Sequence, residues 1–581
     1  MSGYDHLSGS TGRGKRKAYA IGGVGIVFVV AVVIGVAVSV GNRSSSSSQS
    51  DAGTSGSGAS TSMKKSIEAI CQPTDYREAC VNSLSSSGGN STDPKDLIQT
   101  GFQAAIKQVR AAIQNSTVVK DLAKDPRSKQ ALETCQHLLE YSIDDLQSSF
   151  ERLGAFDVSK LDKFMADLHV WLSGAITFQE SCLDGFENTT GAAAKKMKQI
   201  LQSSRELTSN GLAMVTEISS LLGSLNIPDV SRRLLSEEQD GIAEFPSWVN
   251  EGRRKLLAAA PQDIKPDLVV AQDGSGKYKT IREALNDVPK NNNKTFVIYI
   301  KEGVYKEKVL VDKKTTHVMM IGDGPTKTVI TGSLNYVDGV QTCNTATFTA
   351  IGSNFIAKDI KFENSAGAEK HQAVALRVQS DMSVIYNCHM DAFQDTLYAH
   401  AHRQFYRNCT ISGTIDFIFG DALAVFQNCQ MFVKKPLESQ QCIVTASGRS
   451  ERRSASAIIL QNCTISADPA YYPLRNVNKA YLGRPWKDYS RTIIMQSQID
   501  NLIQPQGWLP WMGDFALNTC FYVEYGNRGA GSATAGRAKW RGIKNISAQH
   551  IVDFTPKAFF KGDDAWITAT GVPYSPKLMT V

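Results

Sequence analysis

The clearest pattern along the chain is a short apolar run, rich in β-branched and aromatic residues, that ends in asparagine and a small residue. Five segments carry it: KDIKFENSAG (358–367), SVIYNCHM (383–390), QFYRNCTISG (404–413), AVFQNCQMF (424–432) and IILQNCTIS (458–466). Strand-like units that repeat every 20–25 residues or so predict a parallel β-helix, in which equivalent asparagines and cysteines stack as ladders.

The spacing of the repeats also locates an insertion. The asparagines are Asn364, Asn387, Asn408, Asn428 and Asn462, with steps of 23, 21, 20 and 34 residues. The long step predicts a loop of about a dozen extra residues on one coil, where solenoids usually carry binding surface. Asn408 and Asn462 also fit glycosylation sequons, but their place in the ladder favours buried structural asparagines.

A helical periodicity occupies the chain before the repeats. Apolar residues recur at steps of three and four from Leu97 to Ile113 and from Leu132 to Phe150, each marking one face of a helix. Helices of this length within about 160 residues predict an up-and-down four-helix bundle. Its cysteines are even in number, and we expect the pairs Cys71–Cys80 and Cys135–Cys182, although two other pairings remain open.

The N-terminus carries a membrane signal. Arg13, Lys15, Arg16 and Lys17 precede an apolar run over residues 18–41, which is long enough to span a bilayer. The basic flank predicts a cytosolic N-terminus and a luminal remainder. Because the run exceeds a usual signal-peptide core, we favour an uncleaved anchor. Eleven cysteines agree with an oxidising compartment, as do sequons at Asn90, Asn115, Asn188, Asn293 and Asn545.

Between the helical and repeated parts lie two similar polar stretches, SRRLLSEEQ (231–239) and EGRRKLLAAA (251–260). Each has an arginine pair followed by two leucines. Arginine pairs are common on protein surfaces, but two copies in a polar linker of a luminal protein favour proteolytic processing.

Charge divides the chain unevenly. The net charge is +7, yet residues from Ala258 onward hold 36 Lys and Arg against 28 Asp and Glu, whereas the rest hold 27 against 28. With no nucleic-acid motif, the basic part suits a polyanionic polymer other than nucleic acid. A mildly basic solvated surface explains the same surplus equally well.

Candidate chemistry gathers in the repeats. Asp395 and Asp416 are 21 residues apart, which is the local coil step, so they should lie on adjacent coils at one angular position. Gln372 precedes Gln394 by 22 residues, so their amides should stack as well. Two close carboxylates keep one proton between them, and neutral amides can donate to an oxyanion. The set suits acyl transfer by a carboxylate nucleophile, and a polar ladder inside a solenoid is the alternative.

Two further groups of residues have side chains that could bind a ligand. In YLGRPWKDYSR (481–491), Arg484 could hold an aspartate bidentately and Trp486 could stack on a sugar ring; a turn with a cation–π pair is the alternative. Four histidines lie close together in the sequence: His371, His389, His400 and His402. Their spacing is not that of a zinc site, so no metal or other cofactor is expected.

Four motifs in order, GVYKEKV (303–309), DAFQDTLY (391–398), GTIDFIFG (413–420) and LGRPWKDYSRT (482–492), resemble those of plant pectin methylesterases. CQHLLEYSIDDL (135–146) and ESCLDGF (180–186) are similar to the invertase/pectin methylesterase inhibitor domain that precedes some of these enzymes. The resemblance implies a right-handed parallel β-helix that removes methyl groups from pectin and needs no cofactor.

The resemblance also implies roles for individual residues. Asp416 matches the nucleophile, Asp395 the proton donor, and Gln394, helped by Gln372, the oxyanion stabiliser. Arg484 matches the residue that orients the nucleophile, and the residues matching the substrate site are Gln372, Arg484, Trp486, Thr342 and Phe419. Cys429 and Cys463 match a family disulfide. Because Lys361 replaces a cysteine found in some members, Cys388 is left free or paired with Cys409, and Cys343, Cys442 and Cys520 stay unassigned.

These observations predict six segments: a cytosolic tail (1–17), a transmembrane anchor (18–41), a Ser/Gly-rich linker (42–63), an inhibitor-like bundle (64–225), a processing linker (226–260) and a β-helical catalytic domain (261–581). The implied partners are pectin, separate inhibitor proteins and a subtilisin-like processing protease, in the cell wall, with no nucleic acid. The alternatives are a glycan-cleaving β-helix enzyme, which the stacked glutamines do not fit, and a binding protein in which the bundle alone acts.

Overall fold

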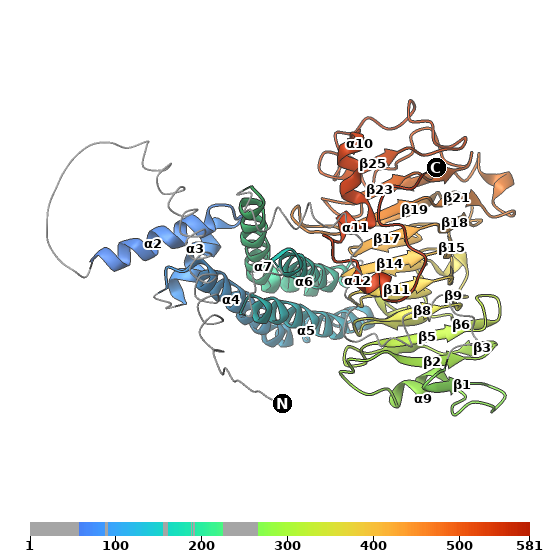
Figure 1. Ribbon diagram of the computed structural model, residues 1–581, viewed down its shortest axis with the longest axis horizontal. Helices are drawn as coiled ribbons and strands as arrows, with labels where there is room; N and C mark the ends of the chain where they lie inside the picture. The colour runs from blue at the N-terminus through green and yellow to red at the C-terminus, as the bar shows by residue number, and fades with distance from the viewer. Residues whose placement is uncertain are drawn as a thin grey trace, which may run out of the picture.

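The computed structural model describes residues 57–87, 91–154, 161–187, 189, 192–224 and 265–580. Helices occupy the chain up to Ser224 and strands dominate from Leu268 onward. We call residues 57–224 the helical region and residues 265–580 the β-helical region. Figure 1 shows the two side by side, with the helices against one flank of the stacked strands.

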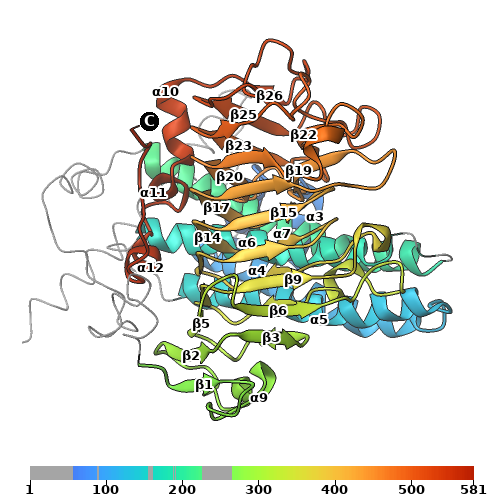
Figure 2. The same cartoon turned by 90° about the vertical axis from the view of Figure 1, so that its right-hand side faces the viewer.

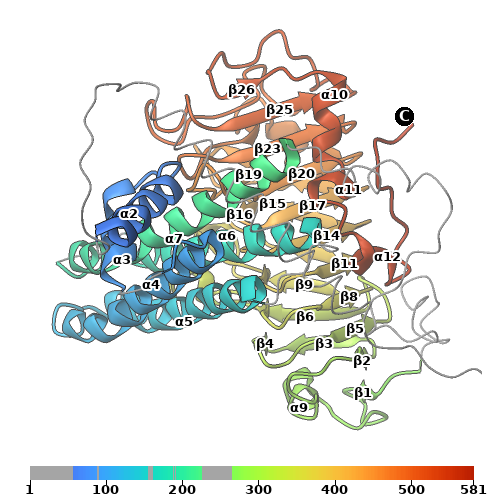
Figure 3. The ribbon, with the colours of Figure 1, turned by 60° about the vertical axis from the view of Figure 1, so that its left-hand side comes forward.

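The helical region is built from long helices whose apolar faces meet. The helices are α2 (Ser57–Cys71), α3 (Arg77–Ser86), α4 (Pro94–Asn115), α5 (Pro126–Gly154), α6 (Leu161–Asp184) and α7 (Ala193–Ser224), with a 3-10 turn η2 (Ser116–Val119). Pro94 opens α4, and the carboxylate of Asp93 accepts a hydrogen bond from the amide of Lys95 at 2.8 Å. Helices α4 to α7 pack against one another around buried residues such as Phe102, Leu139 and Leu172 (Figure 3).

Disulfides join Cys71 to Cys80 and Cys135 to Cys182, so the pairing expected for the helical region is confirmed. The first links α2 to α3, and the second links α5 to α6. Each therefore fixes neighbouring helices of the same region.

The β-helical region consists of three parallel sheets wound in successive coils, as expected (Figure 2). Sheet A, with 11 strands, contains β1 (Leu268–Val270), β2 (Phe296–Ile300), β5 (Val318–Gly322), β8 (Ile356–Lys358), β11 (Ser383–Tyr386), β14 (Arg403–Arg407), β17 (Leu423–Gln427), β20 (Ala457–Gln461), β23 (Arg491–Met495), β25 (Phe521–Tyr525) and β26 (Ile543–Lys544). Sheet B, with 8 strands, contains β3 (Gly303–Lys306), β6 (Thr328–Gly332), β9 (Lys361–Asn364), β12 (His389–Asp391), β15 (Thr410–Gly413), β18 (Gln430–Val433), β21 (Thr464–Ala467) and β24 (Gln498–Ile499).

Sheet C, with 7 strands, contains β4 (Val309–Val311), β7 (Phe348–Ala350), β10 (Leu376–Val378), β13 (Leu397–Ala399), β16 (Ile418–Gly420), β19 (Cys442–Ser447) and β22 (Ala480–Gly483). Short helices accompany the sheets: α9 (Ile281–Asn286), α10 (Ala548–Ile551), α11 (Pro556–Phe559), α12 (Ala565–Thr568), η6 (Thr342–Asn344), η7 (Ala368–Lys370), η8 (Tyr472–Leu474) and η9 (Val552–Phe554). One apolar core fills the coil interior. A second lies between the outer face of sheet A and the C-terminal helices.

Four of the five repeated asparagines make the turn from sheet A to sheet B. The ladder prediction is wrong for Asn364, which ends β9 in sheet B, and Asp359 (φ 59°) takes the turn position on that coil. Asn387, Asn408, Asn428 and Asn462 have φ values of 50°, 52°, 56° and 51°, a left-handed conformation that asparagine tolerates better than most residues. The expectation that Asn408 is buried is wrong, because its side chain is exposed at the turn. Asn462 is half-buried and donates to Asn428 on the preceding coil at 3.0 Å.

The cysteines that follow these asparagines turn into the coil interior. Cys388, Cys409, Cys429 and Cys463 are buried, and all four are unbonded thiols. The disulfide expected between Cys429 and Cys463 is therefore absent, and Cys388 is free. The Sγ atoms of Cys409 and Cys463 instead donate to backbone carbonyls of the preceding coil, at Ile385 (3.3 Å) and Phe426 (3.4 Å).

The extra residues predicted from the 34-residue step form loops before and after β19. The second loop, over residues 448–456, reaches the helical region, where Arg452 and Arg453 pair with Asp75. The inserted loop thus contributes to the contact between the two regions.

The predicted anchor at 18–41 and the predicted processing linker at 226–260 lie outside the described residues, as do residues 42–56 of the predicted Ser/Gly-rich linker. The rest of that linker, residues 57–63, instead forms the first part of α2. Within the described ranges, no helix is both long and apolar enough to cross a membrane. Of the five sequons, Asn115, Asn293 and Asn545 are exposed.

Candidate active site

Asp395 and Asp416 lie on adjacent coils, just before β13 and β16. The backbone amide of Asp395 donates to the carbonyl of Ile415 at 3.0 Å, so the two segments run in parallel register. Both aspartates have positive φ, 63° and 50°. Aspartate, like asparagine, tolerates this left-handed conformation better than most residues. The coil step of 21 residues therefore brings the carboxyls to one place.

Arg484, just after β22, holds one of the two carboxylates. Its Nε lies 2.8 Å and 3.1 Å from the two carboxylate oxygens of Asp416, and its Nη2 donates to the second oxygen. The guanidinium also lies 4.2 Å from the ring centroid of Trp511. A bidentate pair stacked on an indole fixes both the position and the charge of Asp416.

The environment separates the acidity of the two carboxyls. Burial, followed by the nearby charge of Asp416, raises the pKa of Asp395 well above its ordinary value. Burial also raises the pKa of Asp416, but Arg484 acts against it directly. These directions favour the proton on Asp395 and the negative charge on Asp416.

Gln372 and Gln394 come together beside the carboxyls. Their backbones form a parallel β-bridge, and the amide of Ala373 donates to the carbonyl of Gln394 at 3.2 Å. Within the described part of the chain, neither side-chain amide donates a hydrogen bond, and the buried Oε1 of Gln372 has no partner. Two donors are thus free to meet a ligand oxygen.

An aromatic row follows the outer face of sheet C next to these residues. Tyr398 and Phe419 are paired in register and stack with ring centroids 4.3 Å apart, and Trp486 lies 5.9 Å from Phe419. Cys343 packs against the same cluster, which places its neighbour Thr342 at the edge of this face. The row presents flat aromatic rings on the outer face of sheet C.

The sequence analysis missed three residues of this surface: Tyr398, Lys487 and Trp511. Tyr398 could have been found from the coil step, since it stands 21 residues before Phe419. Lys487 follows Trp486 directly, but no pattern marks it as different from other lysines. Trp511 comes from a long connection, and no repeat predicts its position.

The helical region covers the aromatic row. Ser181, near the end of α6, contacts the hydroxyl of Tyr398 at 3.4 Å and Nε2 of His400 at 2.9 Å. Asp184 pairs with Lys487, and the carbonyl of Gly185 accepts a hydrogen bond from Gln341 at 2.6 Å. The last turn of α6 therefore lies over the face that carries the candidate site.

Further along the contact, buried polar residues of α5 and α6 meet partners on the strand side. Asp145 pairs with His402 at 2.8 Å, and this carboxylate raises the pKa of His402 to about 9 although burial opposes it. Asp167 pairs with the buried Arg403 at 2.9 Å. Thr177 donates to Asp421 at 2.7 Å.

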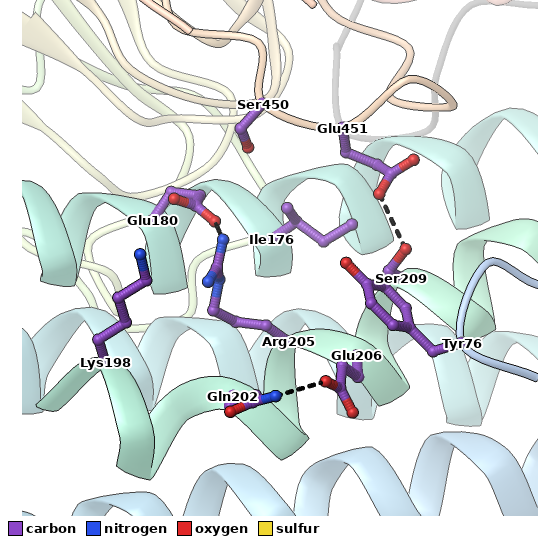
Figure 4. A pocket seen from close by; sticks show the side chains of 10 residues that line it. All are labelled: Tyr76, Ile176, Glu180, Lys198, Gln202, Arg205, Glu206, Ser209, Ser450 and Glu451. Atoms are coloured by element: carbon purple, nitrogen blue, oxygen red, sulfur yellow. Dashed lines mark hydrogen bonds and ion pairs between the residues drawn. The ribbon is translucent and has the colours of Figure 1, made fainter. Parts of the chain in front are cut away.

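A cavity of about 360 Å³ lies between the two regions (Figure 4). Its walls are the helical residues Tyr76, Ile176, Glu180, Lys198, Gln202, Arg205, Glu206 and Ser209 together with Ser450 and Glu451 of the inserted loop. Glu180 pairs with Arg205, and Ser209 donates to Glu451 at 2.8 Å. The carboxyl pair does not line this cavity, which belongs to the contact between the regions.

The four histidines are dispersed. His371 is exposed, His389 lies on sheet B, and His400 and His402 are buried under α6. In the described ranges, no group of three His, Cys, Asp or Glu side chains is placed to hold a metal ion.

Family models match both parts of the chain. The model described as "Pectinesterase" matches residues 267–563, and the model described as "Plant invertase/pectin methylesterase inhibitor" matches residues 65–214. The chain belongs to the pectinesterase family and carries an inhibitor-type domain before the enzyme domain.

Similar proteins agree with this assignment. "Probable pectinesterase/pectinesterase inhibitor 21" of Arabidopsis thaliana is 52% identical over 89% of this chain and 76% of that protein. "Probable pectinesterase/pectinesterase inhibitor 58" of the same plant is 52% identical over 88% of this chain and 90% of that protein. The solved structure "Pectin methylesterase from Carrot" is 49% identical, with a TM-score of 0.54, and covers 54% of this chain and 99% of that one.

Proposed function

We propose that this pectinesterase removes methyl groups from methylated homogalacturonan through an aspartyl acyl-enzyme. The observation that carries the proposal is the pair of buried carboxyls with different acidity beside two open amide donors. A glycan-cleaving reaction would have no use for the amides at that position.

In the first half-reaction the Asp416 carboxylate attacks the ester carbonyl carbon. The amides of Gln372 and Gln394 donate to the oxygen that becomes negative. As the tetrahedral intermediate collapses, Asp395 gives its proton to the departing methoxide oxygen, and methanol leaves. Asp416 is then joined to the uronate carbonyl as an anhydride.

In the second half-reaction Asp395, now ionised, takes a proton from water as the water attacks the uronate carbonyl. The bond to Asp416 breaks, which releases the uronic acid and leaves the proton from water on Asp395. The released uronic acid then gives its own proton to solvent. Arg484 stabilises Asp416 as it leaves, because its guanidinium holds both carboxylate oxygens. Trp486, Phe419 and Thr342 hold the sugar chain along sheet C.

The helical region restrains the enzyme until it is removed. The contacts of Ser181 and Asp184 with Tyr398 and Lys487 support this, since α6 occupies the face on which the polymer would lie. Cleavage in the linker at 226–260 by a subtilisin-like protease releases the β-helical part into the cell wall, and the anchor at 18–41 retains the precursor until then. Separate inhibitor proteins bind the face exposed by release.

The test of the reaction is methanol release from methylated pectin by the Ala258–Val581 fragment, with reducing ends counted in parallel. We expect methanol without new reducing ends. New reducing ends would show that the fragment cleaves the glycan chain. If neither methanol nor new reducing ends appear, the proposal that the fragment is an enzyme is contradicted.

The test of processing is substitution of Arg232, Arg233, Arg253 and Arg254 by alanine. We expect full-length protein to accumulate in the secretory pathway, and N-terminal sequencing of wild-type protein extracted from the wall should begin near Leu235 or Leu257. An active wall enzyme with the helical region still attached would contradict processing.

A further inference from the structure

Lys487 is a cation beside the aromatic row of sheet C. Its acidic partners all come from the helical region. Its ammonium pairs with Asp184 and lies 3.8 Å from Glu187. Although burial opposes the shift, these two carboxylates and that of Glu180 raise the pKa of Lys487. In the described part of the β-helical region, no carboxylate pairs with it.

The position of Lys487 ties it to the reacting groups. It follows Trp486, whose ring centroid lies 5.2 Å from the ammonium, and stands three residues after Arg484. Arg484 holds Asp416, and Trp486 closes the aromatic row. A sugar unit stacked on this row brings its substituents within reach of the lysine.

Arg377 and Lys308, on the same face, also lack acidic partners in the described ranges. Arg377 donates to Gln379 at 2.9 Å and to the carbonyl of Cys343 at 3.4 Å. Lys308 donates to the carbonyl of Asn344 at 2.8 Å. Cations gathered without internal counter-charges repel one another, so a ligand carboxylate stabilises the surface that they form.

Asp184 supplies such a carboxylate in the intact chain. Burial, opposed by Lys487, raises the pKa of Asp184 to about 7. After burial, its charge is also among the causes that raise the pKa of Tyr398 and of Cys343. Ser181, three residues earlier on α6, contacts Tyr398, so this turn of α6 reaches from Lys487 to the aromatic row.

From this placement we propose that Lys487 binds the free carboxylate of a uronate unit that is already demethylated, next to the unit being hydrolysed. Asp184 fills the same position before the helical region is removed. The inference rests on the function proposed above. A methyl ester carries no charge and gains little from an ammonium, whereas a uronate gains a charge-assisted hydrogen bond. Lys487 thus directs the enzyme to esters that border demethylated stretches.

The test uses the Ala258–Val581 fragment, which has an apolar core of its own. The carrot structure, matched over 99% of its length by 54% of this chain, supports such a fragment as a folding unit. The substrates are a highly esterified pectin and the same pectin with about half of its esters removed at random by base. Competitive binding is measured by calorimetry with fully demethylated oligogalacturonate, which needs no turnover.

We expect Lys487→Met to lower kcat/KM on the half-esterified pectin about tenfold more than on the highly esterified one, mainly through KM. Affinity for the oligogalacturonate should fall by about the same factor, and the wild-type preference should fade at high salt. Lys487→Arg, which keeps the charge, should retain most of the preference. Lys306→Met, an exposed lysine on β3 of sheet B, should match the wild type.

Equal losses on both pectins with unchanged oligogalacturonate affinity would overturn the inference and leave Lys487 a structural residue. If the wild-type fragment releases no methanol at all, the proposed function has failed. Calorimetry still tests the uronate site in that case. If Lys487→Met binds the oligogalacturonate more weakly than the wild type while Lys306→Met does not, the uronate site is supported. If Lys487→Met binds it as tightly as the wild type, the uronate site is contradicted.

Discussion

The two regions differ in how they use buried polar residues. In the β-helical region, the coil interior is apolar, and the polar groups that matter sit on the outer face of sheet C, where Asp395, Asp416 and Arg484 meet. In the helical region, α5 and α6 bury Asp145 and Asp167 on a face that points away from the helical core. These residues are buried because the other region covers them.

This difference reflects the different roles of the contact between the regions and of the active face of sheet C. A permanent contact between domains is mostly apolar, whereas contacts that form and break are more polar. The pairs Asp145–His402, Asp167–Arg403 and Asp184–Lys487 make this contact specific, yet each partner can return to water when the regions separate. The active face of sheet C has the opposite requirement, since its groups must hold one geometry throughout the reaction.

The largest effect should come from breaking the polar cluster of sheet C. Asp416→Asn removes the nucleophile, so kcat for methanol release by the Ala258–Val581 fragment should fall at least about 10³-fold. Thermal unfolding of the variant serves as the folding control. Near-normal release by a folded variant would assign the nucleophile to another residue.

The next effect tests the amide donors. Gln394→Ala should lower kcat by roughly 10²–10³-fold, because one donor to the oxyanion is lost while the carboxyls remain. Steady-state kinetics on methylated pectin separate kcat from KM. A change confined to KM would make Gln394 a substrate-binding residue only.

A smaller effect on methanol release should follow from a substitution in the helical region. Asp145→Ala leaves the buried His402 without its carboxylate, which weakens the contact between the regions. Methanol release by the intact chain should therefore rise about tenfold, since a 1.4 kcal/mol weaker contact exposes the site ten times more often. Glu133→Ala, an exposed residue of the same helix, is the matched control. Unchanged activity of the intact Asp145→Ala chain would show that this pair does not hold the regions together.

The last prediction concerns pH. The contact raises the pKa of Asp184 to about 7, mainly through burial, and the pKa of His402 to about 9, where Asp145 overcomes burial. Both groups bind protons more tightly in the contact than in separated regions. Association should therefore strengthen as pH falls through this range, and be weakest above about pH 9.

Binding of the separated helical fragment to the Ala258–Val581 fragment, followed from pH 9 to pH 6, measures this directly. We expect affinity to rise at least about tenfold over the range, because the shift of Asp184 alone gives about that factor. Affinity that falls towards pH 6 would mean that the ionised form of Asp184 is required for the contact.

Much of this architecture follows from the sequence alone. A parallel coil stacks each residue on its equivalent in the next coil, so the 21-residue step from Asn387 to Asn408 predicted that Asp416 lies beside Asp395. Helical faces follow from local periodicity, whereas the cysteine count of the helical region was compatible with the two observed disulfides and with two other pairings. Arg484 and Trp486 were identified through a family motif, and no spacing could have shown that Arg484 reaches Asp416 across two coils.

Only the tertiary structure decided how the two regions meet. Asp184 and Lys487 are 303 residues apart, and Asp145 and His402 are 257 apart. No periodicity links such pairs, because their meeting depends on the fit of two folded surfaces. The same holds where the ladder prediction went wrong. Asn408 and Cys463 occupy the predicted coil positions. The left-handed turn exposes the side chain of Asn408, and the thiol of Cys463 donates a hydrogen bond to a backbone carbonyl instead of forming a disulfide. A repeat sets which residues are stacked, while packing decides which way each side chain faces and what it bonds.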